Sequence, residues 1–291
     1  MAKNNRKLMM SSEDLQGEIR KRWGEAASSW QRRTAELREM FCPITSELIA
    51  AAEIESGDAV LDVAGGAGEP ALTIVRKVGP LGAVMCTDIS QEMLEVAQHE
   101  ALVQRLENIA FYTTGAESLP FDNAIFDAVT CRLGAMFFSD PVASVSQMLR
   151  VAKPGAKIAF AVWSGYEENP FFSMVDRFLP GDETAPQKDH VPGAFRYGEP
   201  GKLSSLLNAA GTRETTEAFL DFKIRASVML EQFWSLKVDL SYSVKAALAD
   251  LSEAEGLLLA REVTSAVKPY FGSGQLEMPA RVLVVSGRKK H

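Results

Sequence analysis

The chain has 291 residues, of which 46% are hydrophobic and 24% are charged, and its formal net charge is −7 at pH 7. This composition is that of a globular protein with a full core, and the negative charge disfavours nucleic acid as a partner. No run of about 18 apolar residues occurs, so we expect no membrane span, and residues 1–15 lack the apolar segment of a signal peptide. The three cysteines have no metal-ligand spacing, and their odd number argues against a disulfide framework. We therefore expect a cytoplasmic protein with no metal site.

Helices are expected first, over residues 12–53, because apolar side chains such as Ile19, Trp23 and Ile44 recur there at helical spacing. From Gly57 to residue 164, short apolar runs alternate with helical segments. Such alternation, with near-continuous apolar strands, predicts a parallel sheet covered by helices on both faces. A loop-rich stretch and then more helices follow. The expected strands are residues 58–64, 82–89, 109–115, 126–131, 157–164, 214–222 and 280–287.

The first strand runs into a turn of small residues that suits a bound ligand, since glycine lets a ligand approach the backbone. The turn reads Ala64, Gly65, Gly66, Ala67, Gly68. Residues 66–71 fit the G-x-G-x-x-A dinucleotide fingerprint, which keeps a nicotinamide-dependent oxidoreductase open as an alternative.

Two carboxylates, Asp62 and Glu69, flank this turn. Near a diphosphate they would cost several kcal/mol at an effective dielectric of about 20. A ligand with a cationic end fits better, and S-adenosylmethionine carries a sulfonium and an ammonium but no phosphate. The sequence therefore favours S-adenosylmethionine as the cofactor.

A third acid, Asp88, ends the second strand. Ligands of open parallel sheets bind outside the carboxyl ends of the strands, so Asp88 is expected beside the glycine turn, where it can accept from both ribose hydroxyls. This role does not discriminate between NAD and S-adenosylmethionine. A purely structural role at the start of the next helix is the alternative.

Four stretches, residues 61–72, 86–97, 115–131 and 148–164, together resemble a known family. They resemble the class I S-adenosylmethionine-dependent methyltransferases, in particular the ubiquinone/menaquinone-biosynthesis C-methyltransferase-like (methyltransferase type 11) group. The resemblance implies an α/β fold: a Rossmann-like, seven-stranded, mostly parallel sheet in the order 3-2-1-4-5-7-6, whose last strand is antiparallel. N-terminal helices and a late helical insertion would flank the sheet.

The resemblance also implies three parts. Residues 1–56 would form an N-terminal helical lid, and residues 57–164 the S-adenosylmethionine-binding core. Residues 165–291 would supply an acceptor-side insert, helices and the strands that complete the sheet.

The resemblance implies roles for single residues of the core. The methionine end of the cofactor would lie on the turn after the first strand and on the end of the fourth, the ribose on Asp88, and the adenine beside the second and third strands. Two positions depart from the family pattern: Ala64 replaces a glycine, and Gly115 replaces an Asp or Asn that accepts from the adenine amino group. The implied cofactor-binding residues are Asp62, Ala64, Gly65, Gly66, Gly68, Asp88, Ile89, Met93, Gly115, Ala116, Glu117, Cys131, Arg132 and Leu133.

Other readings of these side chains stay open. Arg132 could pair with Asp140 instead of touching a cofactor, Glu117 could be a solvated loop charge, and Cys86 and Cys131 could be small buried apolar groups.

Methyl transfer from a sulfonium is an in-line displacement, for which alignment can contribute about 7–11 kcal/mol. A base is needed only if the acceptor carries a proton of high pKa, and the sequence names none clearly. The candidates, His190 and Tyr197 with Asp189 and Glu168, lie in the loop-rich insert.

The acceptor is expected to be a small hydrophobic or aromatic metabolite. A homodimer is left open, and so is a non-catalytic S-adenosylmethionine-binding protein. The aromatic and apolar side chains expected around the acceptor are Trp23, Trp30, Phe41, Met136, Phe137, Phe138, Trp163, Phe171 and Phe172.

Overall fold

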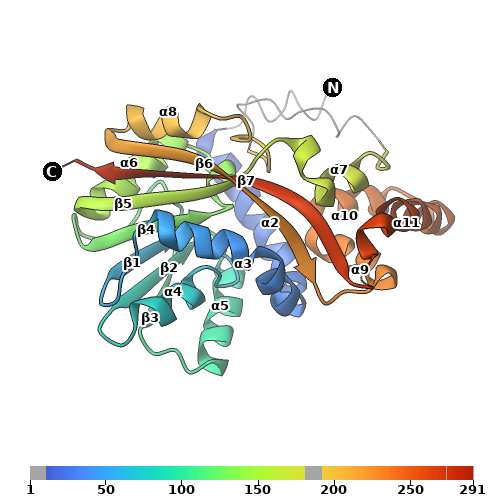
Figure 1. Cartoon of the computed structure of the whole chain (residues 1–291), viewed down its shortest axis with the longest axis horizontal. Coiled ribbons are helices and arrows are strands. Elements are labelled where there is room, and N and C mark those ends of the chain that lie inside the picture. Colours follow the sequence, from blue (N-terminus) through green and yellow to red (C-terminus); the bar gives the residue numbers. More distant parts are fainter. Residues whose placement is uncertain (1–10, 181–191, 273, 291) are drawn as a thin grey trace.

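The computed structural model describes residues 11–180, 192–272 and 274–290. Its centre is a seven-stranded sheet in the order β3-β2-β1-β4-β5-β7-β6 (Figure 1). Strands β1 to β5 are parallel, and β7 pairs antiparallel with both β5 and β6. The predicted fold class and strand order are therefore confirmed. The strands are β1 (Ala59–Val63), β2 (Ala83–Asp88), β3 (Ile109–Thr113), β4 (Phe126–Arg132), β5 (Ala152–Trp163), β6 (Thr212–Ala226) and β7 (Leu276–Lys289).

Helices cover both faces of this sheet. In Figure 1, α3, α4 and α5 lie on one side of it and α6 and α8 on the other, while α7, α9, α10 and α11 gather beyond one end of β6 and β7. The helices are α2 (Ser12–Arg32), α3 (Thr34–Ala51), α4 (Ala71–Val78), α5 (Gln91–Val103), α6 (Pro141–Val151), α7 (Pro170–Asp176), α8 (Lys202–Ala209), α9 (Leu230–Leu240), α10 (Tyr242–Ala249) and α11 (Glu253–Val267).

The core lies where the parallel strands are buried on both faces. Val60 and Leu61 of β1 are fully buried, as are Met40, Ile44 and Leu48 of α3. Each such side chain stabilises the fold by about 1.5–3 kcal/mol relative to an exposed one. Helix α3 is thus part of the core, whereas α2 packs mainly against α5 and α9.

The two last strands are longer than the sequence pattern predicts. Strand β6 spans Thr212–Ala226 instead of 214–222, and β7 spans Leu276–Lys289 instead of 280–287. Along β6, more exposed and less exposed residues alternate over most of its length, so polar residues continue the strand where an apolar run has ended.

The strand register brings the predicted site residues to one edge. Asp62 of β1 pairs in register with Cys86 of β2 and Thr130 of β4. The carboxyl ends of β1, β2 and β4 therefore meet where the strand order reverses, the place where open α/β sheets bind ligands.

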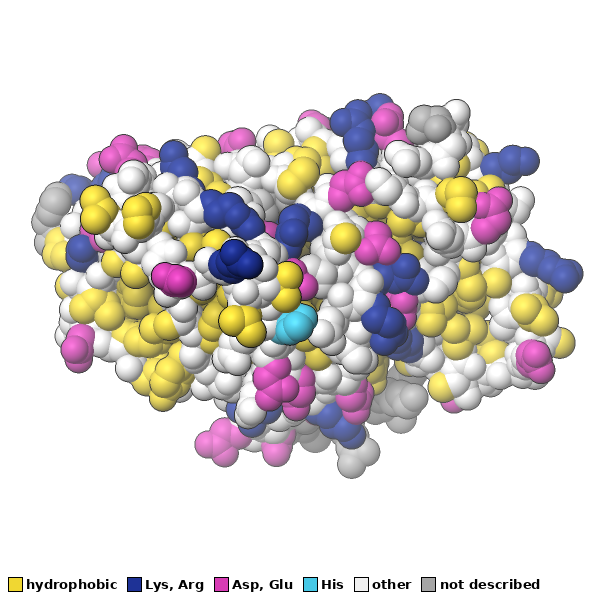
Figure 2. Space-filling model, turned by 90° about the horizontal axis from the view of Figure 1, so that it is seen from below, with side chains coloured by type: hydrophobic (Ala, Val, Ile, Leu, Met, Phe, Trp, Pro, Cys, Tyr) yellow, Lys and Arg dark blue, Asp and Glu magenta, His cyan; other side chains and the backbone are white. Residues whose placement is uncertain are grey.

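On the face shown in Figure 2, acidic and basic side chains are interspersed, with apolar areas between them. That face carries no continuous basic stripe of the kind that follows a nucleic-acid backbone. None of the described helices is both long enough and apolar enough to cross a membrane. Cys86 and Cys131 are buried and free, and Cys42 is exposed and free.

Candidate functional site: a cleft at the end of strands β1, β2 and β4

The turn after β1 has an unusual backbone. Ala64, Gly66 and Gly68 all have positive φ, at 57°, 54° and 109°. The left-handed conformation suits glycine and strains alanine by about 1–2 kcal/mol, so Ala64 is a strained residue in this turn. The turn is tied to β2 because the Gly65 N–H donates to the Thr87 carbonyl at 2.9 Å.

Asp62 lies behind this turn and is fully buried. Its Oδ1 accepts from the Thr130 hydroxyl at 2.8 Å, while its Oδ2 has no hydrogen-bond partner among the described residues. Burial raises the pKa of Asp62 to about 7, opposed by the Thr130 hydrogen bond and by the positive charge of Arg132. A methyl group on Gly65 would stand 2.7 Å from Oδ2, so only a glycine leaves this oxygen room.

Asp88 borders the cleft and faces the same turn. Its Oδ2 accepts from the Gly66 N–H at 3.0 Å and its Oδ1 from the Ser90 N–H at 2.9 Å. Burial raises the pKa of Asp88 to about 6, and the N–H groups of Ser90 and Gly66 oppose this shift. Ser90 also caps α5 by accepting from the Met93 N–H.

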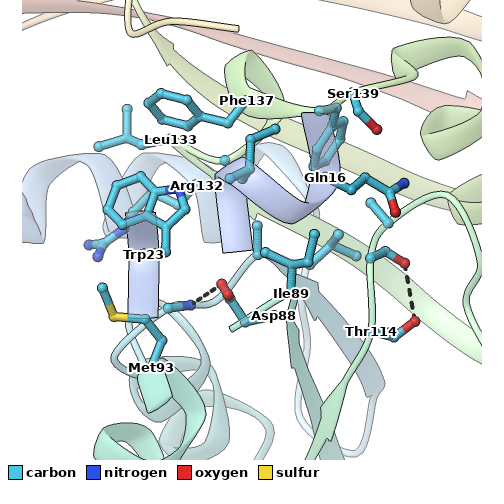
Figure 3. Close-up of a pocket in the computed structure, with 18 of the residues that line it drawn as sticks. Gln16, Trp23, Asp88, Ile89, Met93, Thr114, Arg132, Leu133, Phe137 and Ser139 are labelled. Atoms are coloured by element: carbon cyan, nitrogen blue, oxygen red, sulfur yellow. Dashed lines mark hydrogen bonds between the residues drawn. The ribbon is translucent and has the colours of Figure 1, made fainter. Parts of the chain in front are cut away.

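A single cleft connects the turn, the strand ends and helix α2. The cleft has a volume of about 110 Å³ and opens to solvent on one side. Figure 3 shows Gln16 and Trp23 of α2 across the cavity from Asp88 and Thr114 at the strand ends. The described lining residues are Gln16, Ile19, Trp23, Trp30, Phe41, Val63, Ala64, Gly66, Glu69, Asp88, Ile89, Met93, Thr114, Gly115, Ala116, Glu117, Arg132, Leu133, Gly134, Phe137, Phe138 and Ser139.

Arg132 borders the cleft at the end of β4. Its Nη1 donates to the Thr45 hydroxyl at 2.7 Å, and its guanidinium lies 5.9 Å from the Phe41 ring. Burial lowers the pKa of Arg132, opposed by the charges of Glu69 and Asp62. The alternative pairing with Asp140 is wrong, because that carboxylate caps α6 by accepting from the Ala143 N–H.

Glu117 also lines the cleft, but its carboxylate is hydrogen-bonded to the loop that follows strand β4. Its Oε1 accepts from the Ser139 N–H at 3.1 Å, from the Ser139 hydroxyl at 2.7 Å and from the Asp140 N–H at 3.2 Å. It is therefore not a solvated loop charge. Glu117 stabilises the segment between β4 and α6, and its side chain also borders the cavity.

Several predicted residues do not reach the cleft. Asp62, Gly65, Gly68 and Cys131 lie outside its lining, behind the turn and the strand ends. Tyr197 is 8% exposed and packs in the core under the Arg196 guanidinium, so the structure does not place it at the cleft. His190 and Asp189 lie outside the described residues.

The candidate Glu168 is likewise a structural group, because it pairs with Arg281 at 2.8 Å and accepts from Ser164. The predicted aromatic set divides in two. Trp23, Trp30, Phe41, Phe137 and Phe138 line the cleft, whereas Met136, Trp163, Phe171 and Phe172 pack in the core.

The sequence analysis missed some lining residues. Gln16 lies one helical turn before Ile19 and two before Trp23 on α2, so it shares their face of the helix. This helical spacing could have predicted its position. Thr114, Gly134 and Ser139 follow strand ends in loops, where neither period nor motif marks a position. No group of three or more potential metal ligands was found in the described parts of the chain.

Comparison with known proteins gives two kinds of match. The model of the ubiE/COQ5 methyltransferase family matches residues 45–176. A curated relative, the ubiquinone/menaquinone biosynthesis C-methyltransferase UbiE of Pseudomonas putida strain F1, is 39% identical over 112 residues, which are 38% of this chain and 44% of that protein. The chain thus matches less than half the length of this relative.

Solved structures resemble the chain over more of its length. A Haloferax volcanii protein described as a methyltransferase has a TM-score of 0.55 at 18% identity, covering 92% of this chain and 98% of its own. A Bacillus halodurans protein described in the same way has a TM-score of 0.54 at 19% identity, and the match covers 85% of this chain and 99% of that one. At these identities the likeness shows the fold. Residues 45–176 are therefore similar to the ubiE/COQ5 methyltransferase family, and the sheet has the Rossmann-like fold of class I methyltransferases, as the sequence resemblance predicted.

Proposed function

We propose that the chain is an S-adenosylmethionine-dependent methyltransferase that transfers a methyl group to a small hydrophobic or aromatic metabolite. The observation that carries this proposal is the shared cavity: residues with implied cofactor roles and five aromatic side chains line one cleft. The match to the ubiE/COQ5 family and the fold support it.

The residues present fit the cofactor. The unpartnered Oδ2 of Asp62 is a buried acceptor that a cationic group or a water bound to it would satisfy. A Cβ on Gly66 would meet no atom within 4 Å beyond the neighbouring residues, so the space next to this residue is open to a ligand. Asp88 retains lone pairs for ribose hydroxyls, and Ile89 and Met93 offer apolar contact to the base.

The bound cofactor would supply an activated methyl group on a sulfonium. The chain then has to align the acceptor and exclude water, which is where most of the rate gain of such a reaction arises. Trp23 and Phe137 are positioned for this, since their rings meet edge to face at 5.3 Å over the cleft. The lid role of α2 and the cytoplasmic location stay predictions.

The two glutamates that line the cleft are already hydrogen-bonded to other protein side chains. Glu69 pairs with Arg38 and accepts from Thr73, while Glu117 accepts from Ser139. The described lining therefore favours acceptors that need positioning more than proton removal, such as electron-rich rings, thiolates or amines that are neutral near pH 7. The C-methyltransferase name of the curated relatives makes quinol rings a natural member of the test set.

The test has two stages. Calorimetry should show micromolar binding of S-adenosylmethionine and S-adenosylhomocysteine and no comparable binding of NAD. Mass spectrometry should then detect methylated product from a panel of quinols, phenols, thiols and amines. Tight NAD binding without S-adenosylmethionine binding would favour the oxidoreductase, and cofactor binding without product from any acceptor class would favour a non-catalytic binding protein.

A further inference from the structure

A second cavity lies next to the cleft and has no role in the site described above. It has a volume of about 250 Å³ and lies between α2 and the corner of α9 and α10. It shares two wall residues, Trp23 and Trp30, with the cleft. An apolar cavity of about 150 Å³ can hold benzene, so this one has room for a small substituted ring or a short chain.

Two cations line this cavity. The Lys245 amine donates to the Ser29 hydroxyl at 2.9 Å, and no carboxylate of the described residues lies within ion-pair distance of it. An ammonium has three donors, so Lys245 can bind a further acceptor. The Arg22 guanidinium lies over the Tyr242 ring at 4.7 Å.

Two acids also line the cavity, and both have partners. Asp239 accepts from Arg32 and from Arg33, each at 2.8 Å. The Glu25 side chain is 59% exposed and lies 3.9 Å from the Lys21 amine. The local field therefore favours a single negative charge, while the nearby acids disfavour a doubly charged phosphate group.

The cavity is physically linked to the cleft. Phe137 of the cleft meets Trp23 edge to face at 5.3 Å and lies 5.8 Å from the Arg22 guanidinium. Trp23 also meets Trp30 edge to face at 5.5 Å, and both indoles line both spaces, so they stand where the two spaces meet. A molecule held by Lys245 would therefore direct its apolar part along these indoles toward the cleft.

We propose that this second cavity binds the carboxylate end of the methyl acceptor, whose apolar or aromatic end reaches the cleft past Trp23. The inference rests on the proposed methyl transfer and narrows its substrate class to amphipathic carboxylic acids. Lys245 holds the carboxylate, and the Trp23 and Trp30 rings contact the apolar part.

The test compares matched ligands on the full chain saturated with S-adenosylhomocysteine. Ligand-observed NMR titration would give dissociation constants for 4-hydroxybenzoate, 3-phenylpropionate and octanoate, for their primary amides, and for phenyl phosphate. At least one acid should bind about ten-fold more tightly than its amide, since a hydrogen bond to a charged group is worth about that much. Phenyl phosphate should bind more weakly than the acids.

Variants then assign the site. Lys245→Met should reduce the affinity for the acid at least five-fold and leave the amide unchanged, and Lys245→Arg should restore the preference for the acid. Lys77→Met is the matched control: Lys77 of α4 is exposed and lines neither cavity, so this variant should change nothing.

Equal affinities for every acid and its amide would overturn the inference, and so would an equal loss in Lys245→Met and Lys77→Met. If phenyl phosphate binds more tightly than the acids and this binding depends on Lys245, the inferred ligand is a phosphate ester and the carboxylic acid is ruled out. If S-adenosylhomocysteine fails to bind, the proposed function fails, while the ratio of acid to amide still reports on the second cavity.

Discussion

Replacing Asp62 by Asn tests the electrostatics of the glycine turn most directly. Burial raises the pKa of this carboxyl from 3.8 to about 7. The protonated form is therefore favoured in the folded chain, so the associated stability is fully present below pH 3.8 and is lost as the pH rises through 7. Since one pKa unit corresponds to about 1.36 kcal/mol, ionised Asp62 destabilises the ligand-free fold by roughly 4 kcal/mol above pH 7, as an order of magnitude.

Between pH 5 and pH 8 this linkage amounts to about 2.5 kcal/mol. Urea unfolding at both pH values should show that the wild type loses about that much more stability than Asp62→Asn. Asp88, whose pKa is raised to about 6, contributes equally to both proteins and cancels in the difference. Asp122→Asn, a change of the same charge at an exposed position, is the control and should follow the wild type.

The same variant bears on the cofactor. Asp62→Asn should weaken S-adenosylmethionine binding and leave any affinity for NAD equal or higher, because a carboxylate that attracts an ammonium and repels a phosphate has been removed. Parallel stability curves for the wild type and Asp62→Asn would refute the argument from burial. Unchanged S-adenosylmethionine affinity together with good NAD binding by the wild type would refute the interpretation of the turn.

Three further predictions concern the cleft. Gly66→Val puts a side chain at φ 54° at a cost of about 1–2 kcal/mol, but its Cβ meets no atom within 4 Å, so the variant should still fold. It should abolish S-adenosylhomocysteine binding in calorimetry; a folded variant that still binds would place the ligand elsewhere. Asp88→Ala should weaken S-adenosylmethionine by about 1.5–3 kcal/mol through lost hydrogen bonds to a charged acceptor, and unchanged affinity with an intact fold would remove Asp88 from the ribose role. Hydrogen exchange of α2 should slow on adding S-adenosylhomocysteine, because its first half lies over the cleft and is held there by exposed hydrogen bonds such as that from Arg20 to the Ile89 carbonyl. The buried α3 should not change, and equal exchange in α2 with and without ligand would contradict its role as a lid.

The sequence by itself determined the sheet and the polar end of the site. Each strand with its following helix is a local unit, and the carboxyl ends of parallel strands meet at one edge whatever the rest of the chain does. Asp88 and the positive-φ turn at Gly66 could therefore be placed from strand boundaries alone, and the structure joins them by a hydrogen bond. A sequence motif and the spacing of apolar residues both report on neighbouring residues. They can therefore predict this part of the site, which is made of a strand end and the turn that follows it.

Only the tertiary structure decided which side chains face the cavity. The sequence predicted Tyr197 as a candidate base and Trp163 as a residue around the acceptor, yet both pack in the core, because burial depends on contacts with elements far away in the chain. Glu117 stands at a motif position and turns out to hold Ser139 as well.

The second cavity has no sequence signature at all. It exists because α2 docks on α9, where Arg33 bonds to Asp239 across more than two hundred residues of chain. Such long-range helix packing is set by the fit of whole surfaces, not by the period of either helix. The sequence therefore specified the glycine turn and the strand ends of the cleft, and the fold specified the cavity proposed for the acceptor.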